Sequence, residues 1–446
     1  LVLDPGHALL YFQRLYLAEA DLKAILEERL ALKGPEPAPA LLQPVLDEVL
    51  VANPARSGNN PVRLNDAQVT AVLCGLTRTL ALITGGPGTG KTSLVAALLR
   101  CLVRTGVEAS GIRLAAPTGR AAQRLSDAVR AAIASVATPT PADRSLLTLT
   151  SSTIHKLLSW SETRGAFRHD RSDPVSFDVL IIDEASMISA DLMAALLAAL
   201  PRECRLVLIG DKDQLPSVEA GAVLADLLPA APAFSPGFTS LLAATTGITL
   251  APQGKGRLLD RVVFLAESYR SEASILHFAA AVNRGDTATA ESLPLFTPGS
   301  GAPVWNGLGQ AGHCLRMEPP AGPGRREFLA AWIRERMMDR AGTTAPWHTL
   351  LDRVAAASVD TLADSTPCRE LFTRLASARI LTALRRGPLG CEAINRFLVT
   401  RFREEFDPDR EGQFFHGLPV LVTENNAEKN LYNGDVGLVV RCRGAS

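Results

Sequence analysis

The segment that most constrains this chain is GGPGTGKT at residues 85–92, which satisfies the pattern GxxxxGK(S/T). An apolar run at residues 80–84 precedes it, and a stretch with helical periodicity at residues 92–103 follows it. A strand, a glycine-rich loop and a helix in this order place backbone N–H groups around phosphate oxygens at a helix N-terminus. A glycine-rich turn without a ligand is disfavoured, because lysine is scarce in the sequence and both flanks fit the motif.

The chemistry of this loop predicts that the chain binds ATP together with Mg²⁺. Successive N–H groups cradle the phosphates, Lys91 neutralises the β and γ oxygens, and Thr92 ligates Mg²⁺. The residues expected to bind the nucleotide are Gly85, Gly86, Pro87, Gly88, Thr89, Gly90, Lys91 and Thr92.

Two acidic residues end a second apolar run, at residues 179–182. Parallel strands carry ligands at their carboxyl ends, so Asp183 would reach the Mg²⁺ shell and Glu184 would polarise the attacking water. Two acids after a strand are unspecific alone, but beside a phosphate loop they predict a catalytic pair. Another run, residues 206–209, leads into GDKDQLP, in which Gln214 would contact a γ-phosphate oxygen. A polar turn explains that last segment equally well.

The pattern between residues 80 and 224 predicts an α/β domain with a parallel sheet. Apolar runs alternate there with helical stretches, as in βαβ units. Residues 1–34 are expected to be helical, and the second unit is expected to begin near residue 262 after loose connectors. The expected strands are residues 80–84, 114–116, 179–182, 206–209, 379–384, 419–423 and 435–440, and the expected helices are residues 92–103, 121–133, 190–200 and 391–402.

Composition narrows the class of protein. Lys plus Arg and Asp plus Glu both number 46, so no overall field recruits nucleic acid or a membrane, and a polyanion needs a local groove. The seven cysteines are scattered without zinc spacing, which fits a reduced cytoplasm and no structural metal. The absence of a long apolar run and of a signal-peptide pattern predicts a soluble, cytoplasmic protein without a membrane partner.

Several motifs, in order and spacing, resemble those of superfamily one helicases. They are the phosphate loop, DEAS at residues 183–186, GDKDQ at residues 210–214 and SYR at residues 268–270. The closer resemblance is to the RecD family, the alpha subunit of exodeoxyribonuclease V. It is carried by DEASMI (183–188), GDKDQLPSVEAG (210–221), ESYR (267–270), LTALRRGPLG (381–390) and NGDVG (433–437), and it is dense over residues 66–226 and patchy from there to residue 440.

The resemblance implies roles for further residues. Gln68, in a segment like the Q motif, would read the adenine edge, and Arg270 would be a γ-phosphate arginine supplied across a cleft. On the residues alone, exposed arginines after a strand are usually solvated and a lone histidine is usually packed. The resemblance implies DNA contacts at Pro117, Thr118, Gly119, Arg120, Thr153, His155, Thr382, Arg385 and Arg386.

As a domain plan, the resemblance implies two P-loop RecA-like domains. These are a partner-facing helical remnant at residues 1–60, a first motor domain at 61–261, and a partial second one at 262–446 with a small β segment near 412–446. Two later helicase motifs, one with a second catalytic arginine, do not follow residues 433–437. The second domain is therefore expected to be incomplete, and this chain to hydrolyse ATP poorly.

The implied function is an ATP-dependent DNA helicase subunit, moving 5′ to 3′ in double-strand break repair and recombination. Its implied partners are single-stranded and double-stranded DNA and RecB-like and RecC-like subunits. Two alternatives stay open: a standalone RecD-like helicase, and an interaction subunit that binds nucleotide without hydrolysing it. A general P-loop switch is disfavoured, because it gives no reason for Gln68, Gln214 and Arg270 to occur together.

Overall fold

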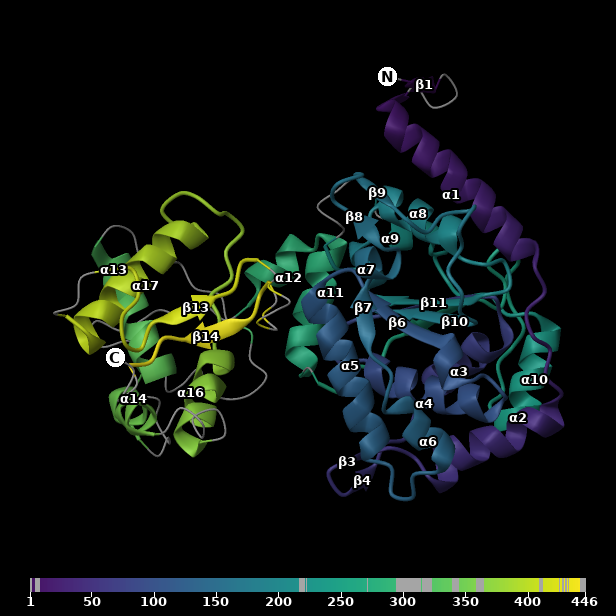
Figure 1. The fold of residues 1–446 in the computed structure, drawn as a ribbon, viewed down its shortest axis with the longest axis horizontal. Coiled ribbons are helices and arrows are strands. Elements are labelled where there is room, and N and C mark those ends of the chain that lie inside the picture. The colour runs from purple at the N-terminus through teal and green to yellow at the C-terminus, as the bar shows by residue number, and fades with distance from the viewer. Residues whose placement is uncertain are drawn as a thin grey trace. The chain divides into compact units, whose positions relative to one another are not determined.

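The computed structural model divides the chain into two compact units, residues 1–271 and residues 272–446, each described by itself below (Figure 1). The residues it describes are 2–4, 9–215, 221, 223–270, 272–293, 314, 323–338, 345–357, 365–408 and, without residues 425, 427, 428, 430 and 432, 412–441.

Unit 1 is built around a sheet of six parallel strands (Figure 1). In spatial order they are β12, β5, β11, β10, β6 and β7, so β5 lies between β12 and β11. The sheet confirms the four strands predicted within residues 80–209. The bounds are β5 (Leu80–Gly85), β6 (Ile112–Ala116), β7 (Ser151–Thr153), β10 (Val179–Ile182), β11 (Arg205–Gly210) and β12 (Val262–Leu265).

Side chains of the central strands alternate between two buried cores. Leu80 and Leu82 belong to one core, and Ala81 and Ile83 belong to the other. Successive side chains of a strand point to opposite faces, and both faces of this sheet are covered by helices. These strands therefore appear in the sequence as continuous apolar runs, which is the pattern that made them predictable.

Helices cover both faces of the sheet, and the predicted helices within residues 92–200 are confirmed as α4, α5 and α8 (Figure 1). The core with Ala81 and Ile83 is closed by α2 (Pro39–Leu46), α3 (Asp66–Thr77), α4 (Lys91–Arg104), α5 (Gly119–Ala134), α6 (Pro141–Leu146) and α10 (Pro236–Thr246). The core with Leu80 and Leu82 is closed by α1 (Gln13–Ala31), α7 (Ile154–Leu157), α8 (Ala190–Ala199) and α9 (Val223–Leu227).

Short elements complete unit 1. The first residues, expected to be helical, instead form a small antiparallel pair, and the helix begins only at Gln13. The elements are β1 (Val2–Asp4), β2 (Leu9–Tyr11), β3 (Arg56–Ser57), β4 (Asn60–Pro61), β8 (Trp160–Ser161), β9 (Ala166–Phe167), a π-helix at Asp47–Ala52 and 3₁₀ turns at Ala109–Gly111 and Ala185–Met187.

The second half of α1 is anchored to unit 1 by Arg29. Its guanidinium is buried and donates to the carbonyl oxygens of Cys204 (2.9 Å), Leu200 (3.2 Å) and Pro201 (2.7 Å). Leu200 is the C-cap residue of α8, so the arginine gives a donor to this helix end and ties the loop after it to α1. Residues 1–60 are therefore part of the first compact unit rather than a separate body.

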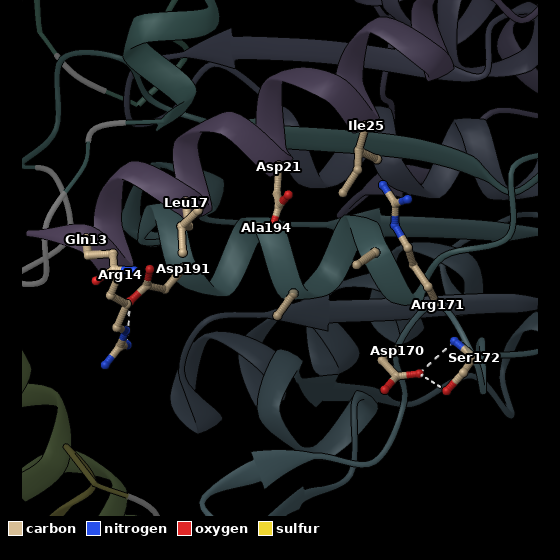
Figure 2. Close-up of a pocket in the computed structure, with 13 residues that line it drawn as sticks. Gln13, Arg14, Leu17, Asp21, Ile25, Asp170, Arg171, Ser172, Asp191 and Ala194 are labelled. Atoms are coloured by element: carbon tan, nitrogen blue, oxygen red, sulfur yellow. Dashed lines mark hydrogen bonds and ion pairs between the residues drawn. The ribbon is translucent and has the colours of Figure 1, made fainter. Parts of the chain in front are cut away.

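A groove of about 1100 Å³ runs along the first half of α1, where the helix faces α8 and the loop at residues 170–172 (Figure 2). Arg14 of α1 forms an ion pair with Asp191 of α8, and Asp170 accepts hydrogen bonds from the backbone and hydroxyl of Ser172. Leu17 lines the groove and remains half exposed. None of the residues predicted to bind ATP lines this groove.

Unit 2 consists, in its described part, of helices around one two-stranded antiparallel sheet. The predicted helix at residues 391–402 and the predicted strands near residues 419 and 436 are confirmed. The elements are α11 (Ala273–Arg284), α12 (Thr287–Glu291), α13 (Pro323–Ile333), a π-helix at Arg334–Met338, α14 (Trp347–Ala356), α16 (Thr366–Ser377), α17 (Cys391–Phe406), β13 (Pro419–Leu421) and β14 (Val436–Leu438).

Two predictions about this half of the chain are wrong. Residues 379–384 form no strand, since no described segment pairs with them. Leu381 is 92% exposed, so burial of its side chain does not stabilise an extended strand at this position. The boundary near residue 262 is also displaced. Because β12 pairs with β5, the first unit extends to residue 271.

Among the described helices, none is both long and apolar enough to cross a membrane.

A buried ion-pair cluster joins α4 to α6. Asp143 is fully buried and accepts from Arg100 Nε (2.7 Å) and from Arg104 Nη1 and Nη2 (3.0 and 2.9 Å). Burial alone would raise the pKa of Asp143, but hydrogen bonds from Arg104, Arg100 and the Thr140 backbone hold it well below the ordinary value. The carboxylate is therefore charged in the folded state at any pH above its usual range.

We expect Asp143→Asn to lower the free energy of unfolding by about 3 kcal/mol or more, because it leaves the buried Arg100 without an anion and removes one of the two carboxylates that pair with Arg104. Urea denaturation at pH 7 measures this. The folded pKa is depressed, so the wild-type contribution is fully present above the unfolded value of about 4 and is lost as the pH falls below it.

The matched control is Asp127→Asn, which removes a carboxylate from an exposed pair with Arg130 at 3.5 Å. Exposed pairs contribute little, so its effect should stay below about 0.5 kcal/mol. Equal effects of the two variants would show that burial does not set the strength of the Asp143 cluster.

Candidate active site

The predicted site residues of unit 1 lie along one edge of the sheet. All six strands are parallel, so the segments that follow them share the carboxyl edge. In spatial order these segments contain Arg270 (after β12), the phosphate loop (after β5), Gln214 (after β11), Asp183 and Glu184 (after β10), Thr118 and Arg120 (after β6) and His155 (after β7, which ends at Thr153). The residues predicted to handle ATP thus follow four neighbouring strands, and those predicted to contact DNA follow the next two.

The phosphate loop is held closed by its own side chains. Lys91 Nζ donates to the carbonyl oxygens of Gly85 (2.6 Å) and Gly86 (3.3 Å), and Thr89 Oγ1 donates to Gly86 O (2.9 Å). Gly88 and Gly90 have positive φ angles of 78° and 77°, which favour glycine. The Lys91 ammonium therefore lies at the loop, where phosphate oxygens can replace these carbonyl oxygens as its hydrogen-bond acceptors.

Three consecutive carbonyls of the loop accept hydrogen bonds from outside it. Pro87 O accepts from Ser268 Oγ (3.0 Å), and Gly88 O accepts from the backbone N–H of Tyr269 (2.9 Å). Thr89 O accepts from Gln68 Nε2 (2.9 Å). The Q-like segment and the ESYR segment, which are far apart in sequence, therefore both fix the loop.

The acidic pair lies in a partly desolvated position beside Lys91. Burial raises the pKa of Asp183, and burial together with the neighbouring Asp183 charge raises the pKa of Glu184. Asp183 Oδ1 accepts the Glu184 N–H (2.9 Å), and Glu184 has a left-handed backbone with φ 55°. Glu184 Oε2 is buried and has no hydrogen-bond partner in the described part of the chain. A buried acceptor without a partner fits a site that takes a cation or water beside phosphate.

Gln214 lies in an ordered turn. Its N–H donates to Asp211 O (3.2 Å), while the Lys212 N–H donates to Thr84 Oγ1 (3.0 Å) and fastens the turn to β5. This accounts for the polar character of the segment, and the contact between Gln214 and a γ-phosphate stays a prediction. Residues 216–220, which carried part of the resemblance, lie outside the described residues.

The structure changes the picture for Gln68 and Arg270. Gln68 is buried, and both ends of its amide are used, since Oε1 accepts the Asn65 N–H (2.9 Å) and Nε2 holds Thr89 O. In this conformation its amide holds the loop, and reading of the adenine edge stays a prediction. Arg270 belongs to unit 1, beside Gly88, because β12 is part of the sheet. The expectation that it is supplied across a cleft is therefore wrong.

Two of the residues predicted to contact DNA in unit 1 cap helices. Thr118 Oγ1 accepts the Ala121 N–H at the start of α5, and Thr153 Oγ1 accepts the Lys156 N–H at the start of α7. Pro117 lies between β6 and the cap residue Thr118, and Gly119 and Arg120 are the first two residues of α5. Helix capping therefore gives both threonines a structural role. The N-termini of α5 and α7 lie at the carboxyl edge of the sheet, after β6 and β7.

His155 belongs to an aromatic cluster that sequence reasoning missed. Its ring lies 6.1 Å from Trp160 and 5.6 Å from Phe167, which are 4.8 Å from each other between centroids. Trp160 and Phe167 lie on the two paired strands β8 and β9, and Trp160 is 43% exposed. An aromatic residue on each side of a Thr-Arg-Gly turn, residues 163–165, was the signal for this hairpin.

The remaining residues predicted to contact DNA lie in unit 2. Arg385 Nε donates to Glu392 Oε1 (3.0 Å), and Arg386 Nε lies 3.9 Å from Glu392 Oε2. Thr382 Oγ1 donates to Leu384 O (3.0 Å). Both arginines are strongly exposed. The structure therefore leaves their role in DNA binding a prediction.

Two further residues of the site escaped sequence reasoning. Asn65 connects the Q-like segment to the ESYR segment, since its Nδ2 donates to Glu267 Oε2 (3.1 Å) and to the Tyr269 hydroxyl (2.9 Å). Arg124 of α5 lies near Glu184, where its positive charge offsets a small part of the rise in the pKa of that carboxyl that burial and Asp183 cause. Among the described residues, no cluster of three or more His, Cys, Asp or Glu side chains could hold a metal ion.

Comparisons with known proteins agree with this arrangement. A family model described as an AAA domain matches residues 68–220, which include the loop and the acidic pair. The RecBCD enzyme subunit RecD of Mycolicibacterium smegmatis is 34% identical to this chain, over 89% of this chain and 62% of that protein. The RecBCD enzyme subunit RecD of Haemophilus influenzae is 32% identical, over 84% of this chain and 57% of that protein. Over most of its length this chain is similar to RecD. The predicted resemblance is thereby confirmed, as is the P-loop α/β fold.

The likeness extends beyond RecD and covers only part of each relative. The ATP-dependent RecD2 DNA helicase of Deinococcus radiodurans is 27% identical over 99% of this chain and 46% of that protein. Among solved structures, Bacteroides sp. Pif1 in complex with ADP-AlF4 matches 85% of this chain and 70% of the Pif1 chain. The identity is 14% and the TM-score is 0.29. The chain spans about half to two thirds of the length of these curated RecD and RecD2 relatives.

We expect Gly88→Ala to lower the free energy of unfolding by about 1–2 kcal/mol, because φ at this position is 78° and a side chain there is strained. The added Cβ would also lie 2.6 Å from Arg270 Cβ and 2.9 Å from Ser268 Oγ. Urea denaturation measures the change.

Gly86→Ala is the matched control in the same loop. A Cβ at Gly86 meets nothing within 4 Å, and its φ is not positive. Its free energy of unfolding should stay within about 0.5 kcal/mol of the wild-type value. A loss as large as that of Gly88→Ala would contradict the described packing of the ESYR segment on the loop.

Proposed function

We propose that this chain is the ATP-hydrolysing part of a RecD-like DNA helicase subunit that acts in double-strand break processing and recombinational repair. The observation that carries the proposal is the shared sheet edge. It brings Lys91, the acidic pair and Arg270 to one row of strand ends and places an exposed aromatic hairpin close to that row. The 5′ to 3′ direction of movement is part of the proposal and follows from the RecD resemblance alone.

The residues of the loop would bind and orient ATP. Lys91 exchanges its contacts with the carbonyls of Gly85 and Gly86 for β- and γ-phosphate oxygens. Thr92 and Asp183 would hold Mg²⁺, which supplies positive charge against the phosphates when bound. Arg270 is exposed beside Gly88 in the same unit, and would add charge stabilisation at the γ-phosphate.

Glu184 would accept a proton from the attacking water. Its carboxylate oxygen Oε2 is buried without a partner, so it can accept a hydrogen bond from water without breaking another contact. Burial and the charge of Asp183 raise its pKa toward the range in which a carboxylate is an effective base. The backbone of Glu184 is left-handed, a strained conformation for a residue other than glycine and one that is often found at functional sites.

DNA contact would occur next to this site. The exposed ring of Trp160, with Phe167 and His155, offers a face on which bases can stack, and Arg120 with the N-terminus of α5 offers phosphate contacts. Because α5 also carries Arg124, whose charge reaches Glu184, the two functions meet on one helix. In unit 2, described by itself, the exposed side chains of Arg385 and Arg386 are proposed to contact DNA phosphates as well.

We expect single-stranded DNA to stimulate ATP turnover by the chain, and Glu184→Gln to lower turnover by about a hundredfold or more. ATP affinity should persist in that variant, since the amide keeps the size and leaves Lys91 and Thr92 in place. Steady-state ATPase assays and equilibrium nucleotide binding, each with and without DNA, measure both quantities.

Lys91→Ala is the control, because it removes the cation that meets the phosphates and should abolish hydrolysis and weaken binding together. If Glu184→Gln lost affinity and turnover in parallel, Glu184 would be a structural or cation-shell residue. Binding without any turnover in the wild type would favour the alternative of an interaction subunit that does not hydrolyse ATP.

A partner surface is proposed on the first half of α1. Phe12 is 71% exposed and Leu17 is 51% exposed, and Leu17 lines the groove that α1 forms with α8 (Figure 2). Exposed apolar residues beside a groove are typical of interaction sites. Two relatives are named as RecBCD subunits, so we propose a RecC-like subunit as the occupant, within a complex that also holds a RecB-like subunit.

We expect Leu17→Glu to reduce co-purification with a RecC-like subunit at least tenfold and to leave ATP turnover unchanged. Val51→Glu is the control, because Val51 is 64% exposed in unit 1 but lies outside α1 and its groove. Equal capture by both variants would contradict the surface. Absence of any RecC-like partner would favour a standalone helicase, a possibility that the RecD2 likeness over 99% of the chain supports.

A further inference from the structure

Asn65, Glu267 and Tyr269 form a closed triangle of hydrogen bonds at the mouth of the phosphate loop. The Asn65 Nδ2 donates to Glu267 Oε2 (3.1 Å) and to the Tyr269 hydroxyl (2.9 Å). The Tyr269 hydroxyl in turn donates to the same Glu267 oxygen (3.0 Å). None of the three was assigned to the site from the sequence, although they join segments that lie about 200 residues apart in the chain.

Asn65 has a second task, which it performs with its other side-chain atom. Its Oδ1 accepts the Gln68 N–H (2.9 Å) and caps α3, while Gln68 Oε1 accepts the Asn65 N–H (2.9 Å) in a reciprocal capping box. One amide therefore fixes the start of α3 with its oxygen and the ESYR segment with its nitrogen. Gln68, held by this cap, is the donor to Thr89 O.

The triangle supports all three hydrogen bonds that loop carbonyls accept from outside the loop. Ser268 and Tyr269, which hold Pro87 O and Gly88 O, directly follow Glu267, and Gln68, which holds Thr89 O, is capped by Asn65. In a trans peptide the C=O of one residue and the N–H of the next point in opposite directions. Because these three carbonyls point out of the loop to their donors, the N–H groups of Gly88, Thr89 and Gly90 point to its inside, where phosphate would bind.

We propose that Asn65, Glu267 and Tyr269 are positioning residues that hold the loop in its phosphate-accepting form. This inference rests on the nucleotide site proposed above and adds to it the group that sets its affinity. The triangle acts on the loop and not on the base, so its effect is the same for any ligand with a terminal polyphosphate.

The test uses variants that remove one hydrogen bond and leave the rest of the structure in place. Asn65→Ser keeps an oxygen that caps α3 and removes the Nδ2 donor without changing charge. Tyr269→Phe keeps the ring and removes the hydroxyl. Asn65→Asp combined with Glu267→Gln reverses donor and acceptor and keeps one carboxylate in the pair. The probe is methylanthraniloyl-ADP with Mg²⁺, measured by fluorescence on the whole chain and displaced by inorganic triphosphate.

We expect Asn65→Ser and Tyr269→Phe each to weaken binding about three- to tenfold, the range for one hydrogen bond. The loss should be equal for the ADP probe and for inorganic triphosphate. The two changes together should weaken binding by less than the product of their separate effects, because they share one network. The reversed pair should bind within about twofold of the wild type.

Unchanged binding by Asn65→Ser, or effects that multiply, would overturn the proposal. A loss for the ADP probe alone would also overturn it, since the residues would then contact the base. If the wild-type chain bound neither probe, the nucleotide site itself would have failed. Hydrogen exchange at the amides of Gly88, Thr89 and Gly90 still decides the matter without ligand: Asn65→Ser should speed it severalfold, and unchanged exchange would overturn the positioning role.

Discussion

The constraint on which this site depends is the shared direction of six strands. Because every strand of the sheet is parallel to its neighbours, the segments after β12, β5, β11, β10, β6 and β7 must meet at one edge. A strand reversed at the centre would carry its acidic or glycine-rich segment to the opposite edge. The order of the strands then decides which segments are neighbours, and here it separates the residues predicted to bind ATP from those predicted to contact DNA.

Much of this edge could be predicted from the sequence, because the signal is local. A strand buried on both faces shows a continuous apolar run, and the residues that end it are read directly after it, as for Asp183 and Glu184. The phosphate loop likewise lies between its strand and helix. The same local signal failed at residues 379–384, where an apolar run has no described partner strand and Leu381 stays exposed.

Contacts between distant segments could not be predicted in this way. Asn65 looks like an ordinary helix cap, and nothing near it in the sequence indicates that its Nδ2 reaches Glu267. The resemblance implies that Arg270 is supplied across a cleft, and the sequence alone does not indicate that β12, which precedes it, joins the sheet of unit 1. Once β12 pairs with β5, both findings follow: the ESYR segment must pass directly over the phosphate loop, where its N–H and hydroxyl groups meet the loop carbonyls.

The acidic pair brings several energetically unfavourable features together at one edge of an otherwise well-packed sheet. Asp183 and Glu184 are desolvated beside one another, one buried oxygen has no partner, and Glu184 has a left-handed backbone. Each feature opposes folding, and a buried acceptor without a donor costs on the order of 1–3 kcal/mol. The apolar strands on both sides of β10 can hold this arrangement in place because they gain stability from burial that does not depend on it. Strain and missing partners at a strand end, inside a rigid apolar frame, are what a site for phosphate, a cation and water requires.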